Sequence, residues 1–317
     1  MSKPILVGYD PRTADRAPVR FGVEAARLTG APVIVAAVEV GGPRSAVEKL
    51  KASGHVDEDL LADCTRAIEE VDAELRDTAV EVECRKLQGT SAARALHEAA
   101  EKEDAGLVVL GSARSSAVGR VAAGATAQRL LHGSPGPVAV VPQDWSAERD
   151  PQTVGATYVH SPEGREALRG AHALARRAGA KLRVMTVVKH TEGMHLETDP
   201  PIPWMLDKRE VVDVEGEHRL DAEQRLREEV AELEGNVPVD AEALVGEPAD
   251  VIVDFSKGVD LLVCGSRGYG PARAVLLGSV SRQVMTQAHC PVIVLPRGVK
   301  ASLEALLEEA PGAAAPA

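Results

Sequence analysis

The sequence predicts an α/β fold built from two tandem open, mainly parallel five-stranded sheets flanked by helices. Short apolar runs alternate along the chain with longer helical stretches, which is the order expected of βαβ units. The apolar runs, such as residues 33–38, lack the two-residue alternation of a half-exposed strand, so they suit strands covered on both faces. The same order of elements occurs twice, which indicates an internal duplication.

The duplication is clearest where two strands recur at a constant offset of 154 residues. The apolar runs that begin at Leu107 and Pro137 return at Leu261 and Pro291. We expect first-half strands near residues 4–9, 32–39, 80–87, 106–111 and 137–141. We expect second-half strands near residues 152–158, 181–188, 238–245, 260–265 and 291–295.

The first helix of each half carries its own stop signal. The two Ala-rich stretches end at Gly30 and Gly179, and glycine just past the last turn is a common helix terminus. In the second half, helical spacing places four apolar residues on one face: Leu168, Ala171, Ala175 and Ala178. We therefore predict one domain over residues 1–145, a second over 151–298, and an extension over 299–317. Residues 303–309 of that extension could form a short helix, and its low-complexity end is expected to be disordered.

Composition narrows the functional classes. The chain has 317 residues, 44% of them hydrophobic, which is enough for two compact cores. Its formal net charge of -12 and its seven aromatic residues disfavour a nucleic-acid surface. The four cysteines show neither CxxC nor zinc spacing, so we expect no metal site and a buried thiol at Cys264. No signal peptide or apolar run of membrane-spanning length is present, so a cytoplasmic protein without membrane contact is expected.

The most informative motif follows the apolar run 261–264. It reads Gly265-x2-Gly268-x9-Gly278-Ser279, a glycine loop between a strand and a helix start. Glycines allow a close backbone approach, and a helix N-terminus offers free N–H groups, so the motif suits phosphate. It lacks the Gly-Lys-Ser/Thr of a Walker loop, and Arg273 stands where a dinucleotide fingerprint has its third glycine.

The loop resembles the nucleotide loop of the universal stress protein family of the UspA type, whose pattern Gly-x2-Gly-x9-Gly-Ser/Thr it matches at every position. The segment 289–296 also resembles that family's last strand, and the resemblance covers about 1–142 and 153–296. It implies a Rossmann-like, adenine nucleotide alpha hydrolase-like fold that binds ATP, with or without Mg²⁺, in the second half. The implied binding residues are Gly265, Arg267, Gly268, Gly278, Ser279, Val280 and Ser281.

The two halves depart from the family pattern in opposite ways. Asp10 matches the family's strand-one aspartate, whose carboxylate would accept hydrogen bonds from ribose; the alternative is an aspartate that caps a turn or opens a helix before a proline. In the second half Val159 takes that position, with His160 or Ser161 as partial replacements. In the first-half loop Arg114 replaces the second glycine and Ala125 replaces the hydroxyl residue.

Each residue of the predicted phosphate site also has a purely structural explanation. The three glycines of the second loop could serve turn geometry alone, and Ser279 could be a plain helix cap. Arg267 could be a solvated loop charge.

The resemblance implies an ATP-binding regulatory module of stress response. No catalytic base, nucleophile or metal triad accompanies the loop, so any hydrolysis is expected to be slow. The alternatives are a nucleotide-free interaction scaffold and a slow ATPase or autophosphorylating protein. We also expect the two last strands to pair within the chain as a pseudo-dimer, because unpaired apolar edges favour association. A further homodimer and an unidentified regulatory protein partner stay open.

Overall fold

The computed structural model describes residues 2–40, 58–112, 124–131, 133–143, 145–146, 150–189, 214–266, 279–296 and 303–308. The first half contains β1 (Ile5–Tyr9), α1 (Ala17–Thr29), β2 (Val33–Val40), α3 (Glu58–Leu75), β3 (Val82–Gly89), α4 (Ala92–Lys102), β4 (Leu107–Gly111), α5 (Ala125–Leu131) and β5 (Val138–Val141). The second contains β6 (Thr153–Thr157), α6 (Pro162–Ala178), β7 (Lys181–Val188), α7 (Val214–Ala231), β8 (Val239–Val245), α8 (Pro248–Phe255), a 3₁₀ turn (Ser256–Gly258), β9 (Leu261–Gly265), α9 (Ser279–Gln287) and β10 (Val292–Leu295), followed by α10 (Leu303–Glu308).

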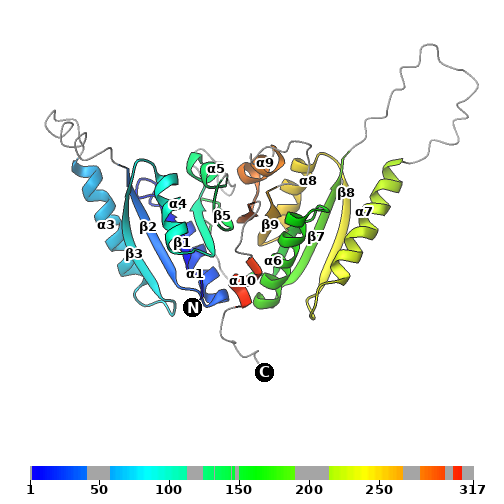
Figure 1. Ribbon diagram of the computed structural model, residues 1–317, viewed down its shortest axis with the longest axis horizontal. Coiled ribbons are helices and arrows are strands. Elements are labelled where there is room, and N and C mark those ends of the chain that lie inside the picture. The colour runs from blue at the N-terminus through cyan, green and yellow to red at the C-terminus, as the bar shows by residue number, and fades with distance from the viewer. Residues whose placement is uncertain are drawn as a thin grey trace, which may run out of the picture.

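The strands form one continuous sheet of ten strands in the order β3-β2-β1-β4-β5-β10-β9-β6-β7-β8 (Figure 1). Within each half every pairing is parallel, as predicted. The halves meet where β5 and β10 run antiparallel, with Ile293 opposite Ala139. The predicted intrachain pairing of the last strands is therefore confirmed, and it joins the two expected five-stranded sheets edge to edge.

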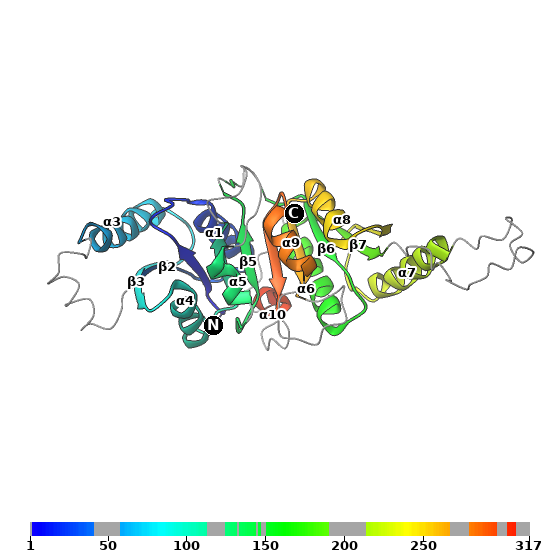
Figure 2. The ribbon, with the colours of Figure 1, turned by 90° about the horizontal axis from the view of Figure 1, so that it is seen from above.

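Both faces of the sheet are buried, which explains the unbroken apolar runs. Along β1, Ile5 and Val7 belong to one core cluster, together with buried residues of α1, α6 and α10. Leu6, between them, belongs to a second cluster with residues of α4, α5, α8 and α9. Figure 2 shows these helices covering the sheet, with α3 and α7 over its outer ends. Each strand thus contributes alternate side chains to two cores.

The predicted glycine ends of the two helices and the predicted apolar face of the second are confirmed. Gly30 and Gly179 follow α1 and α6 with φ of 69° and 64°, in the left-handed region that favours glycine. On α6, Leu168, Ala171 and Ala175 are buried, and Ala178 packs partly buried against the same core. The predicted C-terminal helix is present as α10, while the low-complexity end lies outside the described residues.

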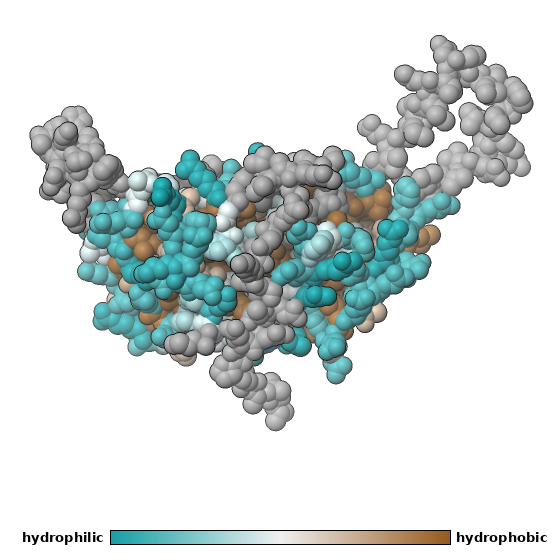
Figure 3. All heavy atoms as spheres, viewed as in Figure 1, coloured by the Kyte–Doolittle hydropathy of each residue, from teal (hydrophilic) through white to brown (hydrophobic). Residues whose placement is uncertain are grey.

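The described surface is mainly polar on the face viewed in Figure 3, with small apolar patches scattered over it. Among the described helices, none has both the length and the apolar character needed to cross a bilayer.

Candidate functional site

The candidate site lies at the carboxyl ends of β6 and β9. These strands are neighbours, with Thr157 opposite Cys264, and β6 pairs with β7 on its other side. The chain leaves β6 toward one edge of the sheet and β9 toward the other, so this is the point where the strand order reverses. In open α/β sheets ligands bind at that point, outside the carboxyl ends of the strands.

Gly265 ends β9 against the first turn of α6. A Cβ at this position would lie 3.1 Å from the Glu163 carbonyl oxygen and 3.3 Å from its carbonyl carbon. Both are backbone atoms, so a side chain here would push α6 away from the strand. The glycine therefore favours close packing of β9 against α6 whether or not phosphate binds.

The two ends of the glycine loop are held together. The buried Ser281 hydroxyl, in the first turn of α9, donates a hydrogen bond of 3.3 Å to the Ser266 carbonyl oxygen. The Ser266 N–H in turn donates to the Leu295 carbonyl oxygen at 2.9 Å. Helix α9 begins at Ser279, and Val280 packs partly buried against the apolar core. The helix start that the sequence predicts for phosphate binding is thus fixed next to the end of β9.

Several predicted binding residues lie outside the described residues. Arg267, Gly268 and Gly278 belong to the segment 267–278, and so their binding roles remain predictions. The same is true of Arg114 in the first-half loop. Helix α5 begins at Ala125, the residue that stands where the second-half loop has Ser279.

Asp10 is part of a turn. Its carboxylate accepts hydrogen bonds from the Arg12 side chain, at 2.9 Å from Nε and 2.9 Å from Nη2, and from the Arg12 backbone N–H at 3.1 Å. Helix α1 begins only at Ala17, after Asp15 Oδ1 accepts the Ala17 N–H. Asp10 therefore lies in a turn and does not open helix α1, and its role toward ribose stays a prediction.

The second half has no carboxylate at the corresponding place. Ser161 is the N-cap of α6, and its hydroxyl accepts the Gly164 N–H at 3.0 Å. The exposed His160 lies with its Nδ1 3.2 Å from the Tyr158 hydroxyl. The residues considered as replacements for the aspartate are thus engaged in the turn between β6 and α6.

Sequence reasoning missed a cluster that both halves repeat beside these turns. Each cluster joins the end of the first strand, the first helix, and the helix before the third strand; the residues are Tyr9, Arg16 and Glu74 in one half and Tyr158, Arg165 and Glu229 in the other. The arginine Nε lies 2.9 Å from the glutamate carboxylate in the first cluster and 3.0 Å in the second. The signal was the spacing Tyr-x6-Arg, which occurs at both places.

Burial sets the ionisation of these clusters. It raises the pKa of Tyr158, and the neighbouring Glu229 raises it further. Burial likewise raises the pKa of Tyr9, although Arg16 opposes the shift. The Arg16 guanidinium also lies over the Tyr9 ring, 4.9 Å from its centroid. The neutral tyrosines and these partly exposed ion pairs hold α3 and α7 against the turns, which indicates a structural role.

The fold defines a tandem protein in which each half has five parallel strands in the same doubly wound order and carries one strand-loop-helix site. The model of the Universal stress protein family matches residues 1–142 and 152–296. The chain belongs to this family. A universal stress protein of Mycolicibacterium smegmatis is 31% identical over 308 residues, which cover 92% of this chain and 96% of that protein.

Solved structures show the same fold. A universal stress protein from Archaeoglobus fulgidus aligns with a TM-score of 0.58 at 17% identity, covering 93% of this chain and 96% of that one. A protein of unknown function from Pseudomonas aeruginosa aligns with a TM-score of 0.63 at 16% identity, covering 98% of both chains. Other universal stress proteins, similar to about half of this chain, were solved in complex with cAMP and with dAMP.

Proposed function

We propose that the chain is a regulatory module of stress response that binds one adenine nucleotide, ATP with or without Mg²⁺, in its second half. The observation that carries this proposal is the hydrogen bond from Ser281 to Ser266, which brings the start of α9 beside the end of β9 at the reversal of strand order. A loop of matching glycine pattern connects these two fixed points. Backbone N–H groups at such a helix start suit phosphate oxygens.

Some residues of the proposed site serve packing and others would contact the phosphates. Gly265 permits the contact with α6, and Ser281 closes the loop through its hydroxyl. Because Val280 packs against the core, its backbone N–H is the group available for phosphate. Gly268, Gly278 and Ser279 would form the remaining cradle, with Arg267 as an additional cation. ATP would contribute its charged phosphates and, where present, Mg²⁺ on their oxygens.

The first half is proposed to bind no triphosphate. Its aspartate is held by Arg12, and the loop carries Arg114 and Ala125 where the second-half loop carries glycine and serine. Each missing phosphate hydrogen bond costs about 1–3 kcal/mol. Two missing contacts together would weaken binding about a hundredfold or more.

Binding rather than turnover is the proposed activity. In the described ranges, no group of three or more His, Cys, Asp or Glu side chains is arranged to hold a metal ion. Val159 favours one competing function, a scaffold that keeps the fold and binds no nucleotide, because the nucleoside end lacks a carboxylate. Release of phosphate during prolonged incubation with ATP would instead indicate the slow ATPase.

Calorimetric titration of nucleotide-stripped protein with ATP and Mg²⁺ tests the proposal, with one equivalent expected per chain. Gly278→Val should abolish binding, whereas Gly124→Val, at the corresponding position of the first half, should leave it unchanged. Ser279→Ala should weaken binding by about 1–2 kcal/mol through one lost charge-assisted hydrogen bond. No heat of binding in the unmodified protein would support the scaffold, and equal losses in both glycine variants would refute the assignment to the second half.

A further inference from the structure

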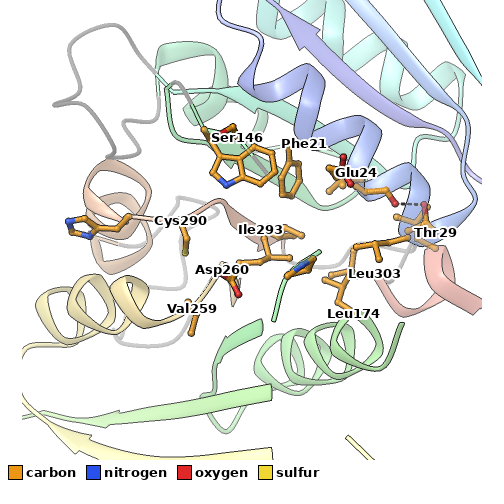
Figure 4. Close-up of a pocket in the computed structure, with 18 residues that line it drawn as sticks. Phe21, Glu24, Thr29, Ser146, Leu174, Val259, Asp260, Cys290, Ile293 and Leu303 are labelled. Atoms are coloured by element: carbon orange, nitrogen blue, oxygen red, sulfur yellow. Dashed lines mark hydrogen bonds between the residues drawn. The ribbon is translucent and has the colours of Figure 1, made fainter. Parts of the chain in front are cut away.

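A cavity of about 460 Å³ lies at the opposite ends of the strands from the glycine loops, between the two halves. In Figure 4, Phe21 and Glu24 of α1 lie across it from Val259 and Asp260 and from Leu174 of α6. Ile293 of β10 and Leu303 of α10 complete the apolar wall, and Trp145 packs edge-on to Phe21 with ring centroids 5.4 Å apart. The volume is within the range of small-molecule sites.

The internal symmetry explains why this space is open. Helix α10 fills a notch beside two glycines: a Cβ at Gly170 would lie 3.0 Å from Leu303 Cβ, and one at Gly106 would lie 2.5 Å from Leu306 Cδ1. The symmetry-related positions are Phe21, 149 residues before Gly170, and Asp260, 154 residues after Gly106. Both line the cavity. The cavity thus corresponds by symmetry to the notch that α10 fills. It is narrower than that notch because α1 carries Phe21 where α6 carries Gly170.

The charges that line the cavity are negative. Glu24 pairs with Arg27 at 2.5 Å, and Asp260 Oδ2 accepts the backbone N–H groups of Gln152 and Thr153 at 2.9 Å each. The Glu24 charge is balanced by Arg27, so an anionic ligand would be repelled mainly by the Asp260 carboxylate beside the apolar wall. An uncharged ligand meets no such repulsion and gains from burial of its apolar surface.

From these observations we propose that the cavity binds an uncharged, mainly apolar small molecule with an aromatic ring system. The rings would lie against the apolar wall that includes Phe21, Leu174 and Ile293. This site is separate from the proposed nucleotide site, and its test requires no nucleotide.

Two dyes that share one ring system but differ in charge test the proposal on the full chain. N-phenyl-1-naphthylamine is neutral, and 8-anilinonaphthalene-1-sulfonate is its sulfonated counterpart. We expect the neutral dye to bind at one equivalent with a dissociation constant of about 1–100 µM, and the sulfonate about tenfold more weakly. Asp260→Asn keeps an acceptor oxygen for the two N–H groups and should strengthen sulfonate binding about threefold or more.

A variant that fills the cavity tests whether the dye binds there. Ala25→Phe adds a ring into the cavity and should weaken the neutral dye at least about tenfold, whereas Arg20→Phe adds the same ring on the exposed side of α1 and should leave binding unchanged. If Ala25→Phe does not fold, energy transfer from Trp145 decides: bound dye should quench tryptophan emission in the unmodified protein, and Trp145→Phe should remove that quenching. Unchanged dye binding in folded Ala25→Phe, equal losses in both phenylalanine variants, sulfonate binding as tight as the neutral dye, or absence of Trp145 quenching would each overturn the proposal.

Discussion

Gly164→Ala should destabilise the second half far more than one methyl group normally does. A Cβ at Gly164 would lie 1.9 Å from the Val159 carbonyl oxygen and 3.0 Å from both Val159 N and C. These are backbone atoms, so either the strand end or the first turn of α6 must move by about 1 Å to reach ordinary contact distance. No rotation of a flexible side chain can relieve the clash.

The cost follows from the hydrogen bonds that this movement would break. Ser161 N–H donates to the Val159 carbonyl oxygen at 2.6 Å, and Ser161 Oγ caps α6 by accepting the Gly164 N–H at 3.0 Å. Loss of a cap costs about 1 kcal/mol and loss of a backbone hydrogen bond about as much. With backbone strain added, we expect a loss of about 2–4 kcal/mol in the free energy of unfolding.

The assay is urea unfolding followed by circular dichroism, with Gly133→Ala as the matched control. A Cβ at Gly133 would meet only His97 Cε1, at 4.0 Å, so that variant should be unchanged or more stable by up to about 1 kcal/mol. A loss below about 0.5 kcal/mol in Gly164→Ala, or the same change in both variants, would refute the reasoning.

Two further predictions concern the joint between the halves and the Arg165–Glu229 ion pair. Ile293→Lys places a charge in the middle of the β5–β10 pairing and should cost about 3–5 kcal/mol, measured by the same urea unfolding. Burial alone would raise the pKa of Glu229, but hydrogen bonds from Tyr158 and Arg165 outweigh it and lower that pKa. The stability that ionised Glu229 contributes is therefore fully present above its ordinary pKa of 4.5 and is lost as the pH falls through the lower folded pKa. Glu229→Gln should flatten the acid side of a plot of unfolding free energy against pH, measured by urea unfolding at each pH. The neighbouring Glu228→Gln should leave that plot unchanged.

The strands could be predicted closely from the sequence because each is a short apolar run between helical stretches. The strand predicted near 260–265 is β9 (Leu261–Gly265), and Gly30 and Gly179 end their helices as expected. The start of α1 was harder, because Asp10 before a proline reads as a helix opening. The structure shows that Arg12 holds Asp10 in a turn and that Asp15 prepares the helix instead.

The parts that the sequence could not predict depend on contacts between distant segments. Glu74 and Glu229 come from helices more than fifty residues after the tyrosines that they approach, and nothing local marks them as partners. The close approach of Gly265 to Glu163 likewise depends on how α6 packs over β9. The cavity depends on the position of α10, which fills only one of the two places that the symmetry of the halves relates to each other.

The joined sheet explains how the halves can differ at their sites while sharing one fold. A ligand at a hundred times its dissociation constant stabilises the folded state that binds it by about 2.7 kcal/mol, which a half that binds no nucleotide lacks. The β5–β10 pairing gives both halves a common core edge, since Val138, Ala139 and Val140 on one side and Val292, Ile293 and Val294 on the other are all nearly inaccessible to solvent. Removing either half would expose this apolar edge, so an isolated half is expected to self-associate through it. If the first half binds no triphosphate, as proposed, its stability is expected to come from its own cores and from this joint rather than from a ligand.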